Sequence, residues 1–174
     1  MADAALRLRR TYPPEPLPLL PSALGNVLRA AEYRAGRPYG LDAVLTWPRL
    51  YPLLSAPVKA AVDDLRLQLD LAVRFTAMFV LAAIASAALL ATHGWWLLVP
   101  VGALVLAWIS SRGAIAAAGA YGGAVEVAFD LTHLELRKAL HQSCPPDRET
   151  ERILNRSLTD FFAGIPTPLE YESE

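Results

Sequence analysis

The sequence predicts an all-α integral membrane protein: a two-helix transmembrane hairpin whose helices extend into a small cytoplasmic helical domain. First, every Lys, Arg, Asp and Glu of the 174-residue chain lies at or before Arg74, or at or after Arg112. The uncharged stretch Phe75–Ser111 has about 37 residues, roughly twice the minimum for one membrane-spanning helix. Second, Thr92-His93-Gly94 is typical of a turn and divides this stretch into two spans.

The charge distribution also divides the chain into segments. We expect a Pro-rich flexible arm over residues 1–21, a cytoplasmic helical or interfacial segment over 22–74, the transmembrane hairpin over 75–111, a second cytoplasmic helical segment over 112–163, and a flexible acidic tail over 164–174. The net charge of −1 lacks the basic excess of nucleic-acid-binding proteins, so we expect no nucleic-acid partner. The single cysteine excludes an internal disulfide.

The first helical segment begins after the proline-rich arm. Ser22 is expected to cap a helix over residues 23–34, and a second helical piece is expected over residues 41–47. Pro48 and Pro52 then predict that no regular helix runs through residues 47–54. The aromatic and apolar side chains there suit either the bilayer interface or a loop packed on the helices, and both alternatives stay open.

A long helix is predicted next, from Pro57 to Ala91, with Ser55 as its cap. Charged residues of alternating sign recur along it at spacings of three or four and predict a solvated, ion-paired stripe. These residues are Lys59, Asp63, Arg66, Asp70 and Arg74. The helix is therefore charged in its first half and uncharged in its second, which is expected to form the first span over residues 75–91.

The second span is predicted over residues 95–111, and both spans are expected to carry anchors at the bilayer interfaces. Aromatic and basic residues favour the headgroup layer. The candidate anchors are Arg74, Trp95, Trp96, Trp108 and Arg112. Because the basic residues flank one side only, the positive-inside rule predicts a multi-pass protein of the cell (inner) membrane with both termini in the cytoplasm.

Small residues follow Arg112 and predict a close helix contact. The candidate packing positions are Ala116, Gly119, Ala120 and Gly123. Such residues let two helix backbones approach, either against the preceding long helix or in a homodimer. Further along, Glu126, Asp130, His133, Arg137 and His141 are expected to form a polar stripe, with Leu131, Leu134 and Leu140 nearer an apolar side. Residues 143–146 then end the helix, and Asp147 caps a last helix over residues 148–163.

Candidate catalytic or metal-binding patterns are weak. Asp63, Asp64 and Asp70 resemble an acid-rich metal motif, but the basic residues on the same helix face favour ion pairing instead. His133, His141 and Cys144 lack zinc-site spacing and a fourth ligand. Neither span contains a charged residue of the kind that an ion path needs. We therefore expect no catalytic residue, metal or cofactor.

Three stretches carry a resemblance to a known family. They read LGNVLRAAE from residue 24, YGLDA from residue 39 and WPRLYPLL from residue 47, and a hydrophobic hairpin follows them. Together they resemble an uncharacterised family of actinobacterial integral membrane proteins, over about residues 19–163. The resemblance implies membrane integration but no activity.

Two functional hypotheses follow from the sequence. The first is a non-enzymatic scaffold or anchor that holds partners at the cytoplasmic membrane face. The alternative is a small subunit of a larger membrane transport or channel assembly. The expected partners are the lipid bilayer and either a second copy of the chain or another membrane protein.

Overall fold

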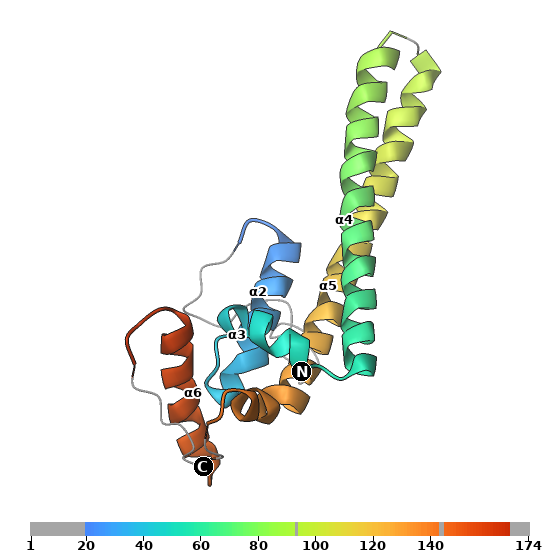
Figure 1. The fold of residues 1–174 in the computed structure, drawn as a ribbon. Coiled ribbons are helices and arrows are strands. Elements are labelled where there is room, and N and C mark those ends of the chain that lie inside the picture. The colour runs from blue at the N-terminus through green and yellow to red at the C-terminus, as the bar shows by residue number, and fades with distance from the viewer. Residues whose placement is uncertain (1–19, 93, 143–144, 168–174) are drawn as a thin grey trace, which may run out of the picture.

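The computed structural model describes residues 20–92, 94–142 and 145–167, and every regular element in them is helical, as the sequence predicts. In chain order the elements are α2 (Ala23–Gly36), the 3-10 turn η1 (Arg37–Tyr39), α3 (Ala43–Leu50), the 3-10 turn η2 (Tyr51–Leu53), α4 (Ala56–Leu90), the 3-10 turn η3 (Gly94–Leu97), α5 (Leu98–Ala139) and α6 (Arg148–Phe162). Figure 1 shows a long pair of helices, α4 and α5, beside a group of shorter ones. We call α2, α3, α6 and residues 113–139 of α5 the helical base.

The long pair is formed by α4 and α5, which run side by side in opposite directions (Figure 1). With 35 and 42 residues, they are about 52 and 63 Å long at about 1.5 Å per residue. We call residues 75–92 and 94–111 the outer half of the long pair. Its buried positions are Ala83, Pro100 and Ala107, and the two alanines are small enough for the backbones to approach closely. The Ser110 hydroxyl donates a hydrogen bond of 2.9 Å to the Ala72 carbonyl and fixes the register of the two helices.

The apolar core of the helical base lies where α3, α5 and α6 meet. Phe129 of α5 is fully buried there, together with Leu50 of α3 and Leu158 of α6. The ring of Trp47 stacks near Phe129 with 6.1 Å between centroids. Of the two alternatives left open for residues 47–54, the structure therefore shows packing against the helices of the base.

Two glycines permit close approaches in the base. Gly122 is buried in α5 where α2 crosses it, and a Cβ at this position would overlap the Cβ of Ala31. Gly40 has a φ of +78°, in the left-handed region that favours glycine, and a Cβ there would lie 2.6 Å from the backbone oxygen of Arg152 in α6. The contacts of α2 with α5 and of η1 with α6 thus require glycine, which has no Cβ, at these two positions.

As predicted, no regular α-helix runs through residues 47–54, because α3 ends at Leu50 and the 3-10 turn η2 follows. The helix expected to end at residue 47 nevertheless continues past Pro48, which lies inside α3. Its missing N–H removes a helical partner from the carbonyl of Val44, but Val44 is 61 % exposed, so water can reach that part of the helix. The carbonyl of the next residue, Leu45, accepts a hydrogen bond of 2.8 Å from the Arg49 guanidinium. Pro52 lies in η2, where the missing N–H is tolerated.

The predicted orientation of the last part of α5 was wrong in part. Leu131 and Leu134 are 62 % and 41 % exposed, whereas Arg137 of the predicted polar stripe is 1 % exposed. Arg137 turns inward because Asn155 of α6 supplies a polar partner, while Asp130 and His141 of the stripe are exposed and Leu140 packs against the core. The helix ends at Ala139, before residues 143–146, and His141 follows in a left-handed conformation with φ 53°.

The helix starts were largely predictable. Ser22, Asp42 and Asp147 each accept a hydrogen bond from a backbone N–H of the first turn that follows. Ser55 is at the predicted N-cap position of α4, but its side chain makes no capping hydrogen bond. The second long helix begins at Leu98 rather than at Trp95, because η3 intervenes.

Some predictions fall outside the described residues. These are the predictions for residues 1–19 of the arm, for His93 of the turn, for residues 143 and 144, and for residues 168–174 of the tail.

The buried glycine of α5 yields a test with a matched control. Gly122→Ala would push α2 away from α5, and we expect it to lower the free energy of unfolding by about 1–3 kcal/mol because over-packing strains a close contact. Gly119→Ala, on an exposed part of the same helix with nothing within 4 Å of its Cβ, should instead be neutral or stabilising by up to about 1 kcal/mol. Denaturant unfolding in detergent, followed by circular dichroism, measures both. Equal effects of the two variants would contradict the α2–α5 contact.

Candidate membrane-spanning surface

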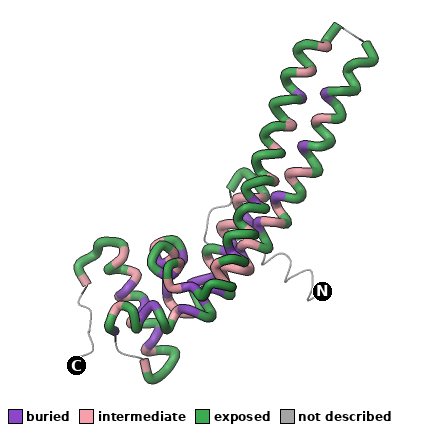
Figure 2. The backbone as a smooth tube through the Cα atoms, turned by 45° about the vertical axis from the view of Figure 1, so that its right-hand side comes forward, coloured by how far each residue is buried: buried purple, intermediate pink, exposed green. Residues whose placement is uncertain are grey.

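The outer half of the long pair carries an apolar surface with no charged side chain. By length and composition, α4 and the segment Gly94–Ala139 are two helices that could cross a membrane. In the most apolar 18-residue segment of each helix, only 6 % and 11 % of the segment is buried, so these segments are not the core of a folded unit (Figure 2). Leu81, Ile84, Leu89 and Leu104 are 54–77 % exposed. Soluble monomers seldom expose a contiguous apolar surface of this extent.

The predicted anchors are all exposed and lie at the two ends of this surface. Trp95 and Trp96 lie in η3 at the outer end, with 4.8 Å between ring centroids and exposures of 72 % and 47 %. At the other end, the Arg112 guanidinium lies 5.3 Å from the ring centroid of Trp108, and Arg74 is exposed on α4. Tryptophans therefore border both ends of the uncharged surface and arginines border its inner end, an arrangement that suits an interfacial role.

Hydroxyl groups within the uncharged segments bond to the backbone. Thr76 donates to the Ala72 carbonyl at 2.8 Å, and Ser86 donates to the Ala82 carbonyl at 2.6 Å. Ser111 donates to the Trp108 carbonyl at 2.7 Å. These side chains satisfy their own donors without water, which makes the segments compatible with a hydrocarbon environment.

The candidate small-residue positions of α5 are less buried than a neighbouring row of small residues. Ala116, Gly119 and Ala120 are exposed, and Gly123 is half-buried. The buried small residues are in a neighbouring row: Ala114, Ala118 and Gly122. Ala120 and Gly123 line a shallow apolar groove facing α4, whereas Ala116 and Gly119 do not. Their use in a homodimer stays a prediction.

A second feature is a polar cluster that joins α5 to η1 and α6 inside the helical base. Arg137 donates to the Asn155 side-chain oxygen at 3.0 Å, and Asn155 donates to the Tyr39 carbonyl at 2.8 Å. His133 stacks on the Tyr39 ring at 4.0 Å, and its Nε2 lies 3.4 Å from the Glu151 carboxylate. Arg137 and Asn155 are each 1 % exposed, so these bonds form away from water and are costly to break.

Tyrosines near acidic groups have raised pKa values. Burial, and then the hydrogen bond of 2.8 Å from its hydroxyl to Asp130, raise the pKa of Tyr39 to about 12. The hydrogen bond of 2.6 Å that the Tyr51 hydroxyl donates to Asp63 raises the pKa of Tyr51. The Lys59 ammonium lies 4.7 Å from the centroid of the same ring.

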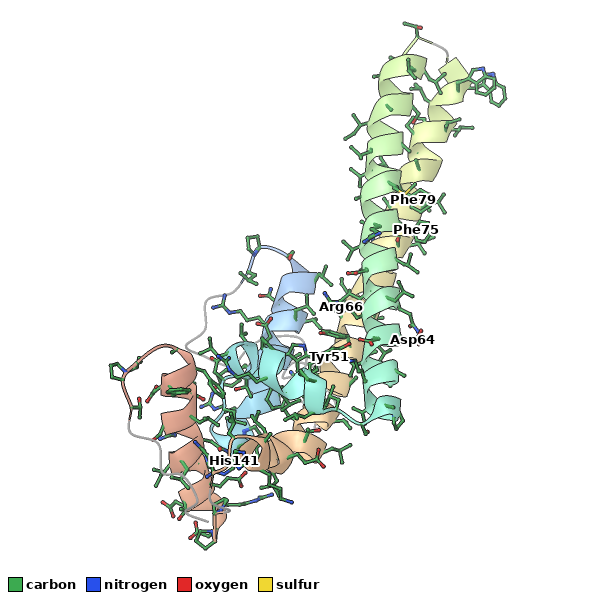
Figure 3. The ribbon with its side chains drawn as sticks, viewed as in Figure 1. Tyr51, Asp64, Arg66, Phe75, Phe79 and His141 are labelled. Atoms are coloured by element: carbon green, nitrogen blue, oxygen red, sulfur yellow. The ribbon has the colours of Figure 1, made fainter. Side chains whose placement is uncertain are left out.

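The contacts of Tyr51 change the interpretation of the charged stripe on α4. Among the residues that the structure describes, no ion pair within 4.0 Å forms along this stripe, and Asp63 bonds to Tyr51 instead. Figure 3 shows Tyr51 facing α4, and the hydrogen bond links η2 to the start of the long helix. Asp64 accepts from Gln68 at 2.9 Å, so the two neighbouring carboxylates serve different partners.

Within residues 20–92, 94–142 and 145–167, no three His, Cys, Asp or Glu side chains gather in an arrangement that could hold a metal ion. A small cavity of about 160 Å³ lies between α2, α3 and α5, lined mainly by apolar side chains with Glu32 and Tyr121 at its edge. Comparisons with protein-family models, with curated proteins and with solved structures find no match to this chain. The resemblance to an actinobacterial membrane family therefore stays a prediction.

Sequence reasoning missed the polar cluster because its members come from three separate segments. The sequence signal for it is the polar stripe between residues 126 and 141, which does not show what the stripe faces. Asn155 and Glu151 of α6 fall on the buried face of a strongly amphipathic helix, but a helical pattern alone does not identify the helix it packs on.

The Tyr39 pKa gives a pH test. Its folded pKa of about 12 exceeds the ordinary value of 10.0, so its contribution to stability is complete below pH 10 and is lost as the pH rises toward 12. In Tyr39→Phe we expect the tyrosinate absorbance titration to lose its highest-pKa component. Tyr33→Phe, at a tyrosine whose ring stacks with Arg37 instead, is the control and should keep that component. An unchanged titration in Tyr39→Phe would contradict the Tyr39–Asp130 bond.

Proposed function

We propose that this chain is a non-enzymatic integral membrane protein that anchors partners at the cytoplasmic face of the cell membrane. In this proposal α4 and α5 cross the bilayer as a hairpin through residues 75–111. The helical base stays in the cytoplasm and is held close to the membrane surface.

One observation carries the proposal: the outer half of the long pair exposes apolar side chains along both helices, and no charged side chain interrupts them there. Burial of apolar area stabilises by about 25 cal/mol per Å², so this surface favours lipid over water. The inner half of the same helices carries charged residues and packs against a folded base with its own core. Function thus resides in the bilayer segment and the base, because few residues lie at the outer end.

The orientation follows from charge. Arg66, Arg74 and Arg112 flank the inner end of the apolar surface, and the described residues at the outer end carry no Lys or Arg. Basic residues near a span are preferentially retained in the cytoplasm, which supports a cytoplasmic helical base.

The anchor hypothesis is favoured over a transport or channel subunit by the composition of the spans. Their polar side chains are hydroxyls bonded to the backbone, so they offer no ionisable group to an ion or a proton. Mild detergent extraction followed by affinity purification separates the hypotheses. An anchor co-purifies with soluble cytosolic proteins through the base, whereas a transport subunit co-purifies with polytopic membrane proteins.

Membrane insertion can be tested with two leucines on one helix. Leu81 is 66 % exposed at the middle of the proposed α4 span, and Leu67 is 56 % exposed on α4 before it. Leu81→Arg should cost insertion about 2.5–3.5 kcal/mol, because it places a charge at the bilayer centre. Leu67→Arg should leave insertion unchanged. The alkali-resistant membrane fraction measures both, and a wild-type chain that is soluble without detergent would refute the proposal.

Topology is tested by thiol labelling in a Cys144→Ser background. We expect Trp95→Cys, at the outer end, to react with a membrane-impermeant reagent in intact cells. Asp160→Cys, on an exposed part of α6, should react only after permeabilisation. The opposite pattern would reverse the orientation, and labelling of both positions in intact cells would exclude a cytoplasmic base.

A further inference from the structure

A groove of about 380 Å³ lies where the first turn of α2 meets the long pair, and its size falls within the usual range of ligand sites. Its walls come from three helices. The lining residues include Ala23 of α2, Val73 and Ala77 of α4, and Ser111 and Ile115 of α5. Because Arg74 and Arg112 directly follow Val73 and Ser111, the groove lies at the level of the proposed cytoplasmic boundary of the bilayer.

The groove presents hydrocarbon rather than polar groups. Three hydroxyl-bearing residues line it, and each bonds back to a nearby backbone group. Ser22 accepts from the Gly25 N–H at 3.1 Å, and the Thr76 and Ser111 hydroxyls donate to the carbonyls of Ala72 and Trp108. No charged side chain lines the groove. Its chemistry therefore suits an alkyl chain and not a polar metabolite.

The charges beside the groove indicate what the alkyl chain belongs to. Arg74 and Arg112 are both exposed, each one residue from a lining position. The cytoplasmic leaflet carries anionic lipids, and basic side chains at its surface attract their phosphates. The groove is also continuous with the lipid-facing surface of α4, since Ala77 belongs to both. A lipid can thus enter it sideways from the leaflet.

We propose that this groove binds one acyl chain of an anionic phospholipid from the cytoplasmic leaflet, with the phosphate directed toward Arg74 and Arg112. The proposal rests on the proposed membrane insertion of α4 and α5. The bound chain contacts α2 on one side and the long pair on the other. It therefore fastens the helical base against the bilayer and acts as a structural lipid.

The test fills the groove from two independent walls. Ala77→Phe on α4 and Ala23→Phe on α2 each replace an exposed lining alanine by a bulky apolar residue. The control is Ala85→Phe, an exposed alanine of α4 about two turns further into the proposed bilayer and outside the groove. Each protein is reconstituted into vesicles of phosphatidylglycerol and phosphatidylcholine, and its membrane association is measured by flotation. It is then exchanged into mild detergent, and the phospholipids retained per chain are identified by native mass spectrometry.

We expect all four proteins to float, the wild type and Ala85→Phe to retain phosphatidylglycerol, and both groove variants to lose it. A wild type that floats but retains no phospholipid overturns the groove and leaves membrane insertion intact. A wild type that does not float overturns both proposals. The assignment of lipid binding to the groove is also overturned if either groove variant retains as much phospholipid as the wild type. The same holds if Ala85→Phe loses its phospholipid together with the groove variants. Equal retention of the two lipids overturns the part assigned to Arg74 and Arg112.

Discussion

The close contact between α4 and α5 is the interaction on which the rest of the structure depends. It uses small residues, Ala83 and Ala107, where larger side chains would separate the helices. The Ser110–Ala72 hydrogen bond sets the register at the level where the charged part of the pair begins. Because α2 packs mainly on α5, the helical base is attached to α5. The contact between α4 and α5 then positions the base relative to α4.

The chain divides its stabilising interactions by environment. In the outer half, polar atoms are few, and the hydroxyls bond within their own helix or to the neighbouring one, so nothing there requires water. In the base, an apolar core around Phe129 is combined with buried polar bonds from Arg137 and Asn155. Such bonds are worth little when exposed but are costly to lose when buried, so they fix how α6 docks. The same fold thus combines an uncharged, apolar part with a base that contains buried polar bonds.

Local signals predicted the helices well, and tertiary partners decided what the sequence could not. The uncharged stretch, the turn after Ala91 and the caps at Ser22 and Asp147 are encoded locally, and the helices begin there. The exposed side of α5 was mistaken, because a polar stripe on a helix says nothing about whether water or α6 faces it. Pro48 was misjudged since its cost depends on the exposure of Val44. Of the candidate site, the tryptophans and arginines at the ends of the apolar surface could be identified from the sequence, but the groove at α2 required three helices to be placed in space.

Both long helices run unbroken past Arg74 and Arg112, and α5 continues into the helical base. In the proposed membrane orientation, a helix pair of this kind behaves as a stiff lever, because neither helix is interrupted at the proposed membrane boundary. Membrane spans adapt to the thickness of the surrounding hydrocarbon by tilting. Any tilt would be carried undiminished along α5 to its far end and would swing the attached helices through the same angle. The spacing between the base and the headgroups would then report the local thickness of the bilayer to whatever binds the base.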